Sequence, residues 1–239
     1  MDSPAIPSPQ PQSEQPAARV IPIDVEHGGI RFAVPGLAVL GFVLGYFLTS
    51  AILNALNADF SVLCVAIIGG IFGAILASAG GDYYLKRVWP SGRSLSLDAE
   101  RLRLVDTRRR RQGETDLLWE QRINPLAWRF TVKRGSARVP KGWLMLSLQL
   151  LQDDRQMTLY TFMPEKSAAT LPAYSLFTPL VPRAQLESDK LSLKEKSEQR
   201  RLLKAETNRW ENGAEVRRED FPILLDIISP HIPEWQTRS

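Results

Sequence analysis

Two long stretches without a charged residue constrain this chain more than any other feature. They run from Phe32 to Ala58 and from Phe60 to Gly81. At about 1.5 Å per helical residue, about 20 apolar residues cross a hydrocarbon layer about 30 Å thick. Core helices of soluble proteins are normally shorter and keep a polar face, so two such neighbouring stretches predict a transmembrane hairpin. We expect it at residues 31–84, with spans at about 33–54 and 60–81.

The basic residues that flank the two stretches indicate their orientation. The turn between them, near residues 54–59, has no Lys or Arg. The flanking basic residues on the other side are Arg19, Arg31, Lys86, Arg87 and Arg93. Because positive flanks stay in the cytoplasm, we expect a multi-pass protein with both termini cytoplasmic. Residues 1–30 are polar and proline-rich rather than built as a cleavable signal, and we expect a retained, disordered tail there.

Small residues recur at every fourth position of both stretches, a spacing that lets helix backbones approach closely in lipid. The main rows consist of Gly41, Gly45, Gly69, Gly73 and Ala77. A second row in the second stretch consists of Ala66, Gly70, Ala74 and Ser78. We expect the two helices to pack on each other through the main rows. The second row leaves open a further face for self-association or for another membrane protein.

Several classes of chemistry find no support in the residues. The only cysteine is Cys64 and the only histidines are His27 and His231, so neither an internal disulfide nor a Cys/His metal cluster is expected. The common phosphate-loop, acyl-transfer and zinc-protease motifs are absent. The carboxylate pair Asp153–Asp154 fits a hairpin turn better than acid–base catalysis. We therefore predict no enzyme, no catalytic residue, no metal and no cofactor.

After the second stretch the apolar pattern changes to a period of two, which is typical of strands. Leucines alternate with polar residues over 94–97 and again over 101–104, on either side of a turn. Further strands are expected at 117–122, 127–132, 143–151 and 156–163. Together they predict a small antiparallel β-sandwich or partly open barrel at residues 88–182. Trp119, Trp128 and Trp143 lie within strand patterns and are expected in its core.

A strand pair RSLSLDAERLRLV follows the hairpin, and a third strand then carries Trp119 just before a polar step to Ile123. This arrangement resembles the bacterial pleckstrin-homology-like (PH-like) domains attached to membrane hairpins, over roughly residues 90–182. The resemblance implies a strongly bent, seven-stranded barrel capped by one helix. It also implies binding of lipid headgroups, peptides or proteins rather than catalysis, and a place in the bacterial inner (plasma) membrane.

The β segment is strongly basic. Residues 83–143 hold fifteen Lys and Arg against six Asp and Glu. Basic residues gain about 1 kcal/mol each near an anionic leaflet, and arginine suits phosphate. We expect lipid or anion binding by Arg108, Arg109, Arg110, Arg111, Lys133 and Arg134. The alternative is that these loops only reinforce topology and solubility. Nucleic acid is not expected, because no RNA-binding motif accompanies the charge.

The last third of the chain predicts helices. Ser192 and Glu195 form a capping-box pattern and Gly213 a stop, within a charged helix expected at 184–218 that lies in solvent or on a partner. We expect residues 219–239 to form a docking helix and tail, apolar on one side through Phe221, Leu224, Leu225 and Ile228. Whether 165–182 or 219–229 caps the barrel stays open.

The fold class predicted is thus a membrane protein of the α+β type: a two-helix hairpin, a PH-like β domain and C-terminal helices. The function predicted is a non-enzymatic, membrane-anchored binding and scaffold module. Its β domain would contact anionic membrane lipids and recruit a protein partner that the sequence does not identify. The alternative is a structural subunit of a larger membrane complex, or a homo-oligomer, assembled through the small-residue faces and the charged helix.

Overall fold

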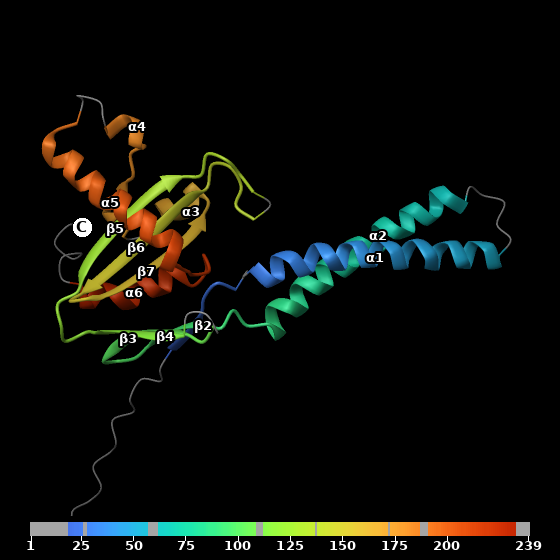
Figure 1. Cartoon of the computed structure of the whole chain (residues 1–239), viewed down its shortest axis with the longest axis horizontal. Helices are drawn as coiled ribbons and strands as arrows, with labels where there is room; N and C mark the ends of the chain where they lie inside the picture. Colours follow the sequence, from blue (N-terminus) through green and yellow to red (C-terminus); the bar gives the residue numbers. More distant parts are fainter. Residues whose placement is uncertain are drawn as a thin grey trace, which may run out of the picture.

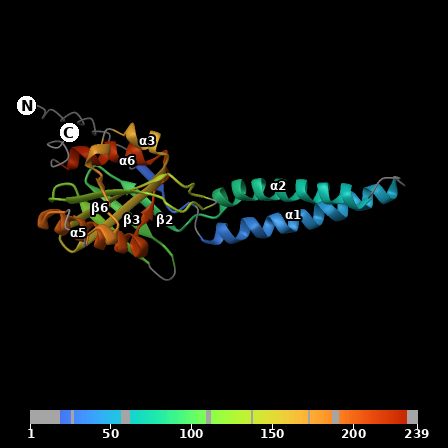
Figure 2. The same cartoon turned by 90° about the horizontal axis from the view of Figure 1, so that it is seen from above.

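The two uncharged stretches each form one continuous helix in the computed structural model, which describes residues 19–25, 28–56, 62–108, 112–136, 138–171, 173–186 and 191–232. Helix α1 spans Gly28–Ala55 and helix α2 spans Val62–Val88. They run side by side away from the rest of the chain (Figures 1 and 2). Both are long and apolar enough to cross a membrane, and only 6% and 11% of their most apolar windows are buried. Neither is a buried core helix.

The small residues lie where α1 meets α2. A β-carbon on Gly41 would come within 2.5 Å of both the Gly73 carbonyl oxygen and the Ala77 β-carbon. One on Gly45 would come within 2.5 Å of the Gly69 carbonyl oxygen. The main rows of small residues therefore bring the two backbones into contact, as close packing in lipid requires.

The second row of small residues also faces α1 over part of its length. Ala66 is fully buried, and a β-carbon on Gly70 would lie 2.9 Å from the Phe42 ring. At these two positions the surface that we considered for self-association is covered within the chain itself.

The first sheet is built from strands on both sides of the helix pair. Its order is β1 (Arg19–Pro22), β2 (Arg93–Leu97), β3 (Arg101–Asp106) and β4 (Gly113–Leu118), and every neighbouring pair is antiparallel. Because β1 precedes α1 and β2 follows α2, the hairpin is an insertion between two paired strands.

Strand β1 corrects the expectation of a disordered tail up to residue 30. Ile21 and Ile23 are buried in the core while Val20 between them is exposed. Ile23 also forms an isolated antiparallel bridge with Val216, near the other end of the sequence. So short a period-two pattern, paired with strands about 70 residues or more away, leaves little local signal. Residues 1–18 of the expected tail lie outside the described residues.

The second sheet contains the longest strands. Its order is β8 (Thr178–Pro179), β5 (Asn124–Thr131), β6 (Leu144–Gln152), β7 (Arg155–Met163) and β9 (Ala214–Glu215). β5, β6 and β7 form an antiparallel meander, whereas β8 and β9 add short parallel pairings at the two edges. The strand expected at 117–122 is shifted, because β4 ends at Leu118 and the chain turns from Trp119.

The helices that follow β7 in the chain lie around the second sheet. They are α3 (Glu165–Ala169), η1 (Tyr174–Leu176), α4 (Arg183–Leu186), α5 (Leu193–Asn212), α6 (Phe221–Ile228) and η2 (Ser229–His231). The predicted capping box of α5 is present at Ser192 and Glu195, and the helix ends before Gly213.

Helix α6 packs in the core between the two sheets (Figure 1). Phe221, Leu224, Leu225 and Ile228 are all buried there, together with leucines from both sheets. The segment 165–182 reaches the same core only through short elements. Of the two candidate capping segments, α6 is therefore the helix that closes the space between the sheets, and the β domain draws on residues well outside 88–182.

Helix α5 lies on the outer face of the second sheet rather than in solvent. Its buried residues are Gln199, Leu202, Ala205 and Arg209, which recur at helical spacing. Two of these four are polar, so the contact face has little of the apolar periodicity that normally identifies a packed helix.

We predict that β1 is essential to the β domain. Ile21→Ala should lower the free energy of unfolding by about 2–5 kcal/mol, because it empties a fully packed position. Val20→Ala, on the exposed side of the same strand, should change it by about 0.5 kcal/mol or less. Denaturant unfolding of the full chain in micelles can be followed by tryptophan fluorescence, since all six tryptophans follow α2. Equal effects of the two variants would contradict the burial of Ile21 and the exposure of Val20 in β1.

A second prediction concerns the helix contact. Gly73→Leu should lower the free energy of helix-pair unfolding by about 1–3 kcal/mol, because the new side chain overpacks the crossing. Gly80→Leu is the matched control, since a β-carbon there would meet nothing within 4 Å. Circular dichroism during thermal unfolding in micelles gives the comparison. A loss as large for Gly80→Leu would place the contact elsewhere on α2.

Candidate ligand-binding surface at the hairpin end of the β domain

Arg93, the first residue of β2, joins the segments that meet beside the helix pair. Its guanidinium is ion-paired with Asp24 and, at 3.2 Å, with Asp106. It also donates hydrogen bonds to the backbone oxygens of Asn212 (3.3 Å) and Gly213 (2.9 Å). The side chain is only 6% exposed. From the sequence we interpreted Arg93 as an orientation signal. In the structure its side chain instead binds several segments at a buried junction.

The segment before α1 is held by backbone as well as side-chain bonds. The amide of Asp24 donates to the carbonyl oxygen of Glu215, and the amide of Glu215 donates to the Asp24 carboxylate, both at 2.8 Å. The Ser91 hydroxyl donates to the Ile23 carbonyl oxygen. The chain just before α1 and the chain just after α2 are thus tied to each other and to β9.

The β3–β4 loop starts at this junction. The Thr107 amide donates to the Gly92 carbonyl oxygen at 2.7 Å, which places the loop beside the residues that follow α2. Arg108 forms an ion pair with Asp106 at 2.6 Å. Burial opposes ionisation of Asp106, but hydrogen bonds from Arg108 outweigh it and lower the pKa of that carboxyl. Arg109, Arg110 and Arg111, also predicted to bind anions, lie outside the described residues.

The β5–β6 loop reaches the same end of the domain. Lys133 and Arg134 are exposed on it. Further along the loop, Arg138 pairs with Glu215 of β9 and lies over the Phe162 ring, 5.3 Å from its centre. The structure therefore brings Arg108 of one predicted basic loop and Lys133 and Arg134 of the other to the end of the β domain from which the hairpin leaves. We call this the hairpin end.

Burial changes the titration of two groups behind this surface. It raises the pKa of the Glu215 carboxyl, against the opposing effect of Arg138. It also raises the pKa of Tyr160 to about 12, with Glu215 and Asp24 adding to the effect. The Tyr160 hydroxyl therefore keeps its proton and donates a hydrogen bond to the Glu215 carboxylate at 3.4 Å. Glu215 is held between a cation and a hydrogen-bond donor.

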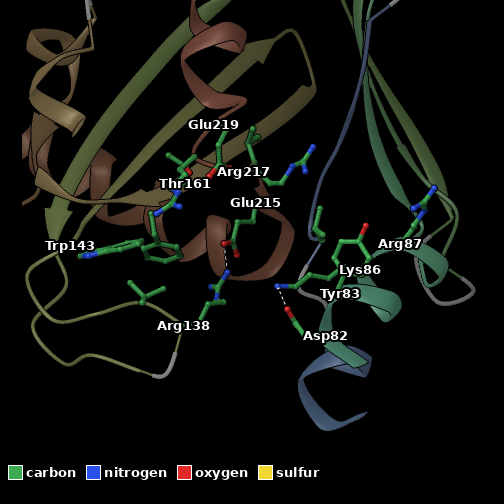
Figure 3. Close-up of a pocket in the computed structure, with 15 residues that line it drawn as sticks. Asp82, Tyr83, Lys86, Arg87, Arg138, Trp143, Thr161, Glu215, Arg217 and Glu219 are labelled. Carbon is green, nitrogen blue, oxygen red and sulfur yellow. Dashed lines mark hydrogen bonds and ion pairs between the residues drawn. The ribbon is translucent and has the colours of Figure 1, made fainter. Parts of the chain in front are cut away.

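A groove with a volume of about 660 Å³ opens at the hairpin end, between the last turns of α2 and the second sheet (Figure 3). We call it the α2 groove. In Figure 3 the Arg138 and Glu215 side chains meet in its middle, with Trp143 on one side and Lys86 on the other. Its basic lining residues are Lys86, Arg87, Arg138, Arg217 and Arg218. Its acidic lining residues are Asp82, Glu215 and Glu219.

The tryptophans divide between core and surface. Trp128 is fully buried, as expected, and its indole N–H donates to Glu206 of α5 at 2.8 Å. Arg209 pairs with the same carboxylate at 2.7 Å. Trp143, which we expected in the core, instead lines the α2 groove, where Arg218 lies 6.0 Å from its ring centre. Sequence reasoning missed Trp143 because a residue at the start of a strand keeps the strand pattern without being covered.

The chemistry available at this surface is ionic and hydrogen-bonding. Among the described residues no group of three His, Cys, Asp or Glu side chains could hold a metal ion. His231 lies away from the groove, stacked on Trp119 with ring centres 4.2 Å apart, and burial lowers its pKa. The arrangement of guanidinium and carboxylate groups suits recognition of a charged, hydroxylated ligand.

We predict that Arg93 stabilises the junction through its charge. Arg93→Met should lower the free energy of unfolding by about 3–5 kcal/mol, because it leaves two largely buried carboxylates, Asp24 and Asp106, without their shared partner. Arg101→Met removes a more exposed pair on the same sheet and should cost about 1 kcal/mol or less. Tryptophan fluorescence during denaturant unfolding measures both. A small effect at Arg93 would show that water replaces it at the junction.

Comparison with known proteins finds no match: no protein-family model, no curated protein and no solved structure matches the chain.

Proposed function

We propose that this chain is a non-enzymatic binding and scaffold module held on the cytoplasmic leaflet of a membrane. The α1–α2 hairpin would span the bilayer, in a bacterial inner membrane. The PH-like β domain would contact anionic lipid through its hairpin end and recruit a protein partner through other surfaces. The observation that carries the proposal is that Arg108, Lys133 and Arg134 lie at the end of the β domain from which the apolar helices leave.

Membrane insertion is supported by what the helices expose. Large apolar side chains point outward along both helices, among them Leu44, Phe47, Ile68, Phe72 and Ile75. An apolar surface of this extent is unfavourable in water. Lys86 and Arg87 stand at the last turn of α2, as expected for the cytoplasmic end of a span. The β1–β2 pairing would keep both flanks of an inserted hairpin on one side of the membrane.

The PH-like assignment is supported by strand count and order. A four-stranded meander and a three-stranded meander enclose one core, and a helix close to the C-terminus packs between them. This agrees with the seven strands and single capping helix that the resemblance implies. β8, β9 and α5 are additions to that plan, and the hairpin is inserted after the first strand rather than placed before the domain.

Recruitment of a protein partner is supported by the outer side of α5. Trp210 is 78% exposed and Leu193 is 86% exposed, one at each end of this helix. The alternative, a structural subunit joined through the small-residue rows, has less support. The main rows of small residues already form the contact between α1 and α2; they are Gly41, Gly45, Gly69, Gly73 and Ala77. The inner face of the charged helix is occupied by the sheet.

The test places single fluorophores on the full chain in lipid nanodiscs, in a Cys64→Ser background. A label at Ile52→Cys on α1 should be quenched by nitroxides on acyl chains, and one at Ser136→Cys in the β5–β6 loop by nitroxides on headgroups. Headgroup quenching at residue 136 should rise when anionic lipid replaces neutral lipid. Lys133→Gln with Arg134→Gln should reverse that rise, because each residue contributes about 1 kcal/mol near an anionic leaflet.

Two controls make the result decisive. A label at Glu100→Cys, in the turn at the opposite end of the first sheet, should stay unquenched in both discs. Arg200→Gln with Arg201→Gln on α5 removes the same charge and should leave the Ser136 label unchanged. An unquenched Ile52 label would refute membrane insertion. A quenched Ile52 label, with Ser136 insensitive to lipid charge, would refute leaflet contact alone.

A further inference from the structure

One wall of the α2 groove is formed by α2, so insertion of α2 in a membrane would set the position of the groove relative to the bilayer. The uncharged stretch of α2 ends at Gly81, and Asp82, Tyr83, Lys86 and Arg87 line the groove just beyond it. At about 1.5 Å per residue, this wall lies within about 9 Å of the end of the apolar stretch. The headgroup layer is about 5–8 Å thick on each side of the hydrocarbon. If α2 spans the bilayer, the groove opens at the level of the lipid phosphates.

The charge of the groove favours an anion. Its lining has five basic side chains against three acidic ones, and within it Lys86 pairs with Asp82 at 2.9 Å and Arg138 pairs with Glu215. Arg87, Arg217 and Arg218 are the remaining basic side chains. Arg217 and Arg218 project from the turn between β9 and α6, and each uses its Nε to bind a carboxylate: Asp220 at 2.9 Å and Glu219 at 2.6 Å. The Nη nitrogens of these two guanidinium groups can therefore donate to a phosphate, which arginine binds with paired hydrogen bonds.

The other polar groups suit a headgroup that carries hydroxyls. Asp82 and Glu219 lie on opposite walls, one on α2 and one on the β9–α6 turn. Each carboxylate is ion-paired through one oxygen, Asp82 Oδ2 with Lys86 at 2.9 Å and Glu219 Oε1 with Arg218 at 2.6 Å, and a carboxylate has two acceptor oxygens. A lipid with only a phosphate and a quaternary ammonium group has no hydroxyl donor for them. Trp143 and Tyr83 add amphipathic rings, which favour the boundary between hydrocarbon and water. The acyl chains of a lipid in the groove would continue along the apolar surface of α2.

We propose that the α2 groove binds the headgroup of one anionic glycerophospholipid of the phosphoglycerol class. Arg217 and Arg218 hold the phosphate, and the carboxylates of Asp82 and Glu219 accept hydrogen bonds from the glycerol hydroxyls. This inference rests on the proposed insertion of the hairpin. It differs from the general attraction of basic loops to a leaflet, because it assigns one lipid to one groove built from five separate segments of the chain.

The test measures lipid retained by the full chain. Delipidated protein in neutral micelles is titrated with phosphatidylglycerol, and bound lipid is counted by native mass spectrometry. One molecule should bind with preference over phosphatidylcholine and phosphatidylethanolamine. Arg217→Gln with Arg218→Gln should weaken its binding by about tenfold or more, because charge-assisted hydrogen bonds are lost. Asp82→Asn should reduce the preference for phosphatidylglycerol over phosphatidic acid, which lacks the hydroxyls.

The matched control is Arg200→Gln with Arg201→Gln, two exposed arginines on α5. It lowers the net charge equally and should leave the dissociation constant unchanged. Equal weakening by both double variants would overturn the groove in favour of diffuse attraction. Equal binding of phosphatidylethanolamine would also overturn it. Displacement of the lipid by glycerol 3-phosphate at equal concentration would overturn it too, and would assign a soluble phosphate instead.

The failures of the two proposals remain distinguishable. An unquenched Ile52 label in nanodiscs removes membrane insertion, and the groove proposal falls with it. A quenched label together with no selective lipid retention removes the groove proposal alone. Unfolding curves of the Arg217/Arg218 variant, followed by tryptophan fluorescence, should match those of the wild type, because both side chains are at least half exposed. A shifted curve would instead make these arginines structural and overturn their assignment as ligands.

Discussion

The antiparallel pairing of β1 with β2 is the constraint on which the rest of the structure depends. These strands lie next to each other in the sheet, yet the whole α1–α2 hairpin separates them in sequence. Closing a loop this long carries an entropy cost, which grows slowly with loop length. The contact between α1 and α2 shortens the effective loop because their ends nearest the sheets lie together. The helix contact and the strand pair therefore support each other.

This connection also fixes how the β domain sits relative to the helices. A domain that follows a hairpin through one linker can rotate about that linker. Here two chain segments leave the domain side by side, and Asp24, Ser91, Arg93 and Glu215 bind them to each other within a few residues of the helix ends. The α2 groove depends on this arrangement, since one of its walls is α2 and the others belong to the β domain. A buried ion pair adds little stability relative to a well-packed apolar replacement, whereas removal of one partner is costly because the other charge stays buried.

Sequence reasoning succeeded where the signal is local. The two apolar helices, the capping box at Ser192, the end of α5 at Gly213 and the apolar face of α6 all follow from spacing within one segment. It failed for β1 and β9, which are short and pair with strands distant in sequence. It also failed for the inner face of α5, where Gln199 and Arg209 make the contact and no apolar stripe marks it. The α2 groove combines residue Val25, α2, the β5–β6 loop, β7 and the segment from β9 to α6, so no single stretch of sequence predicts it.

The structure also changes how the basic composition of the β segment should be counted. Counting the excess of Lys and Arg in residues 83–143 assumes that each charge is available to a ligand. Arg93 is buried and its charge is offset partly by Asp24, which lies before the hairpin. Arg138 is paired with Glu215, which lies far beyond the segment. Arg103 is paired with Asp116 across the first sheet. Attraction to an anion therefore falls on a smaller set of residues than the sequence implies. At the hairpin end, Lys133 and Arg134 are exposed, whereas Arg93 and Arg138 are ion-paired with carboxylates of other segments.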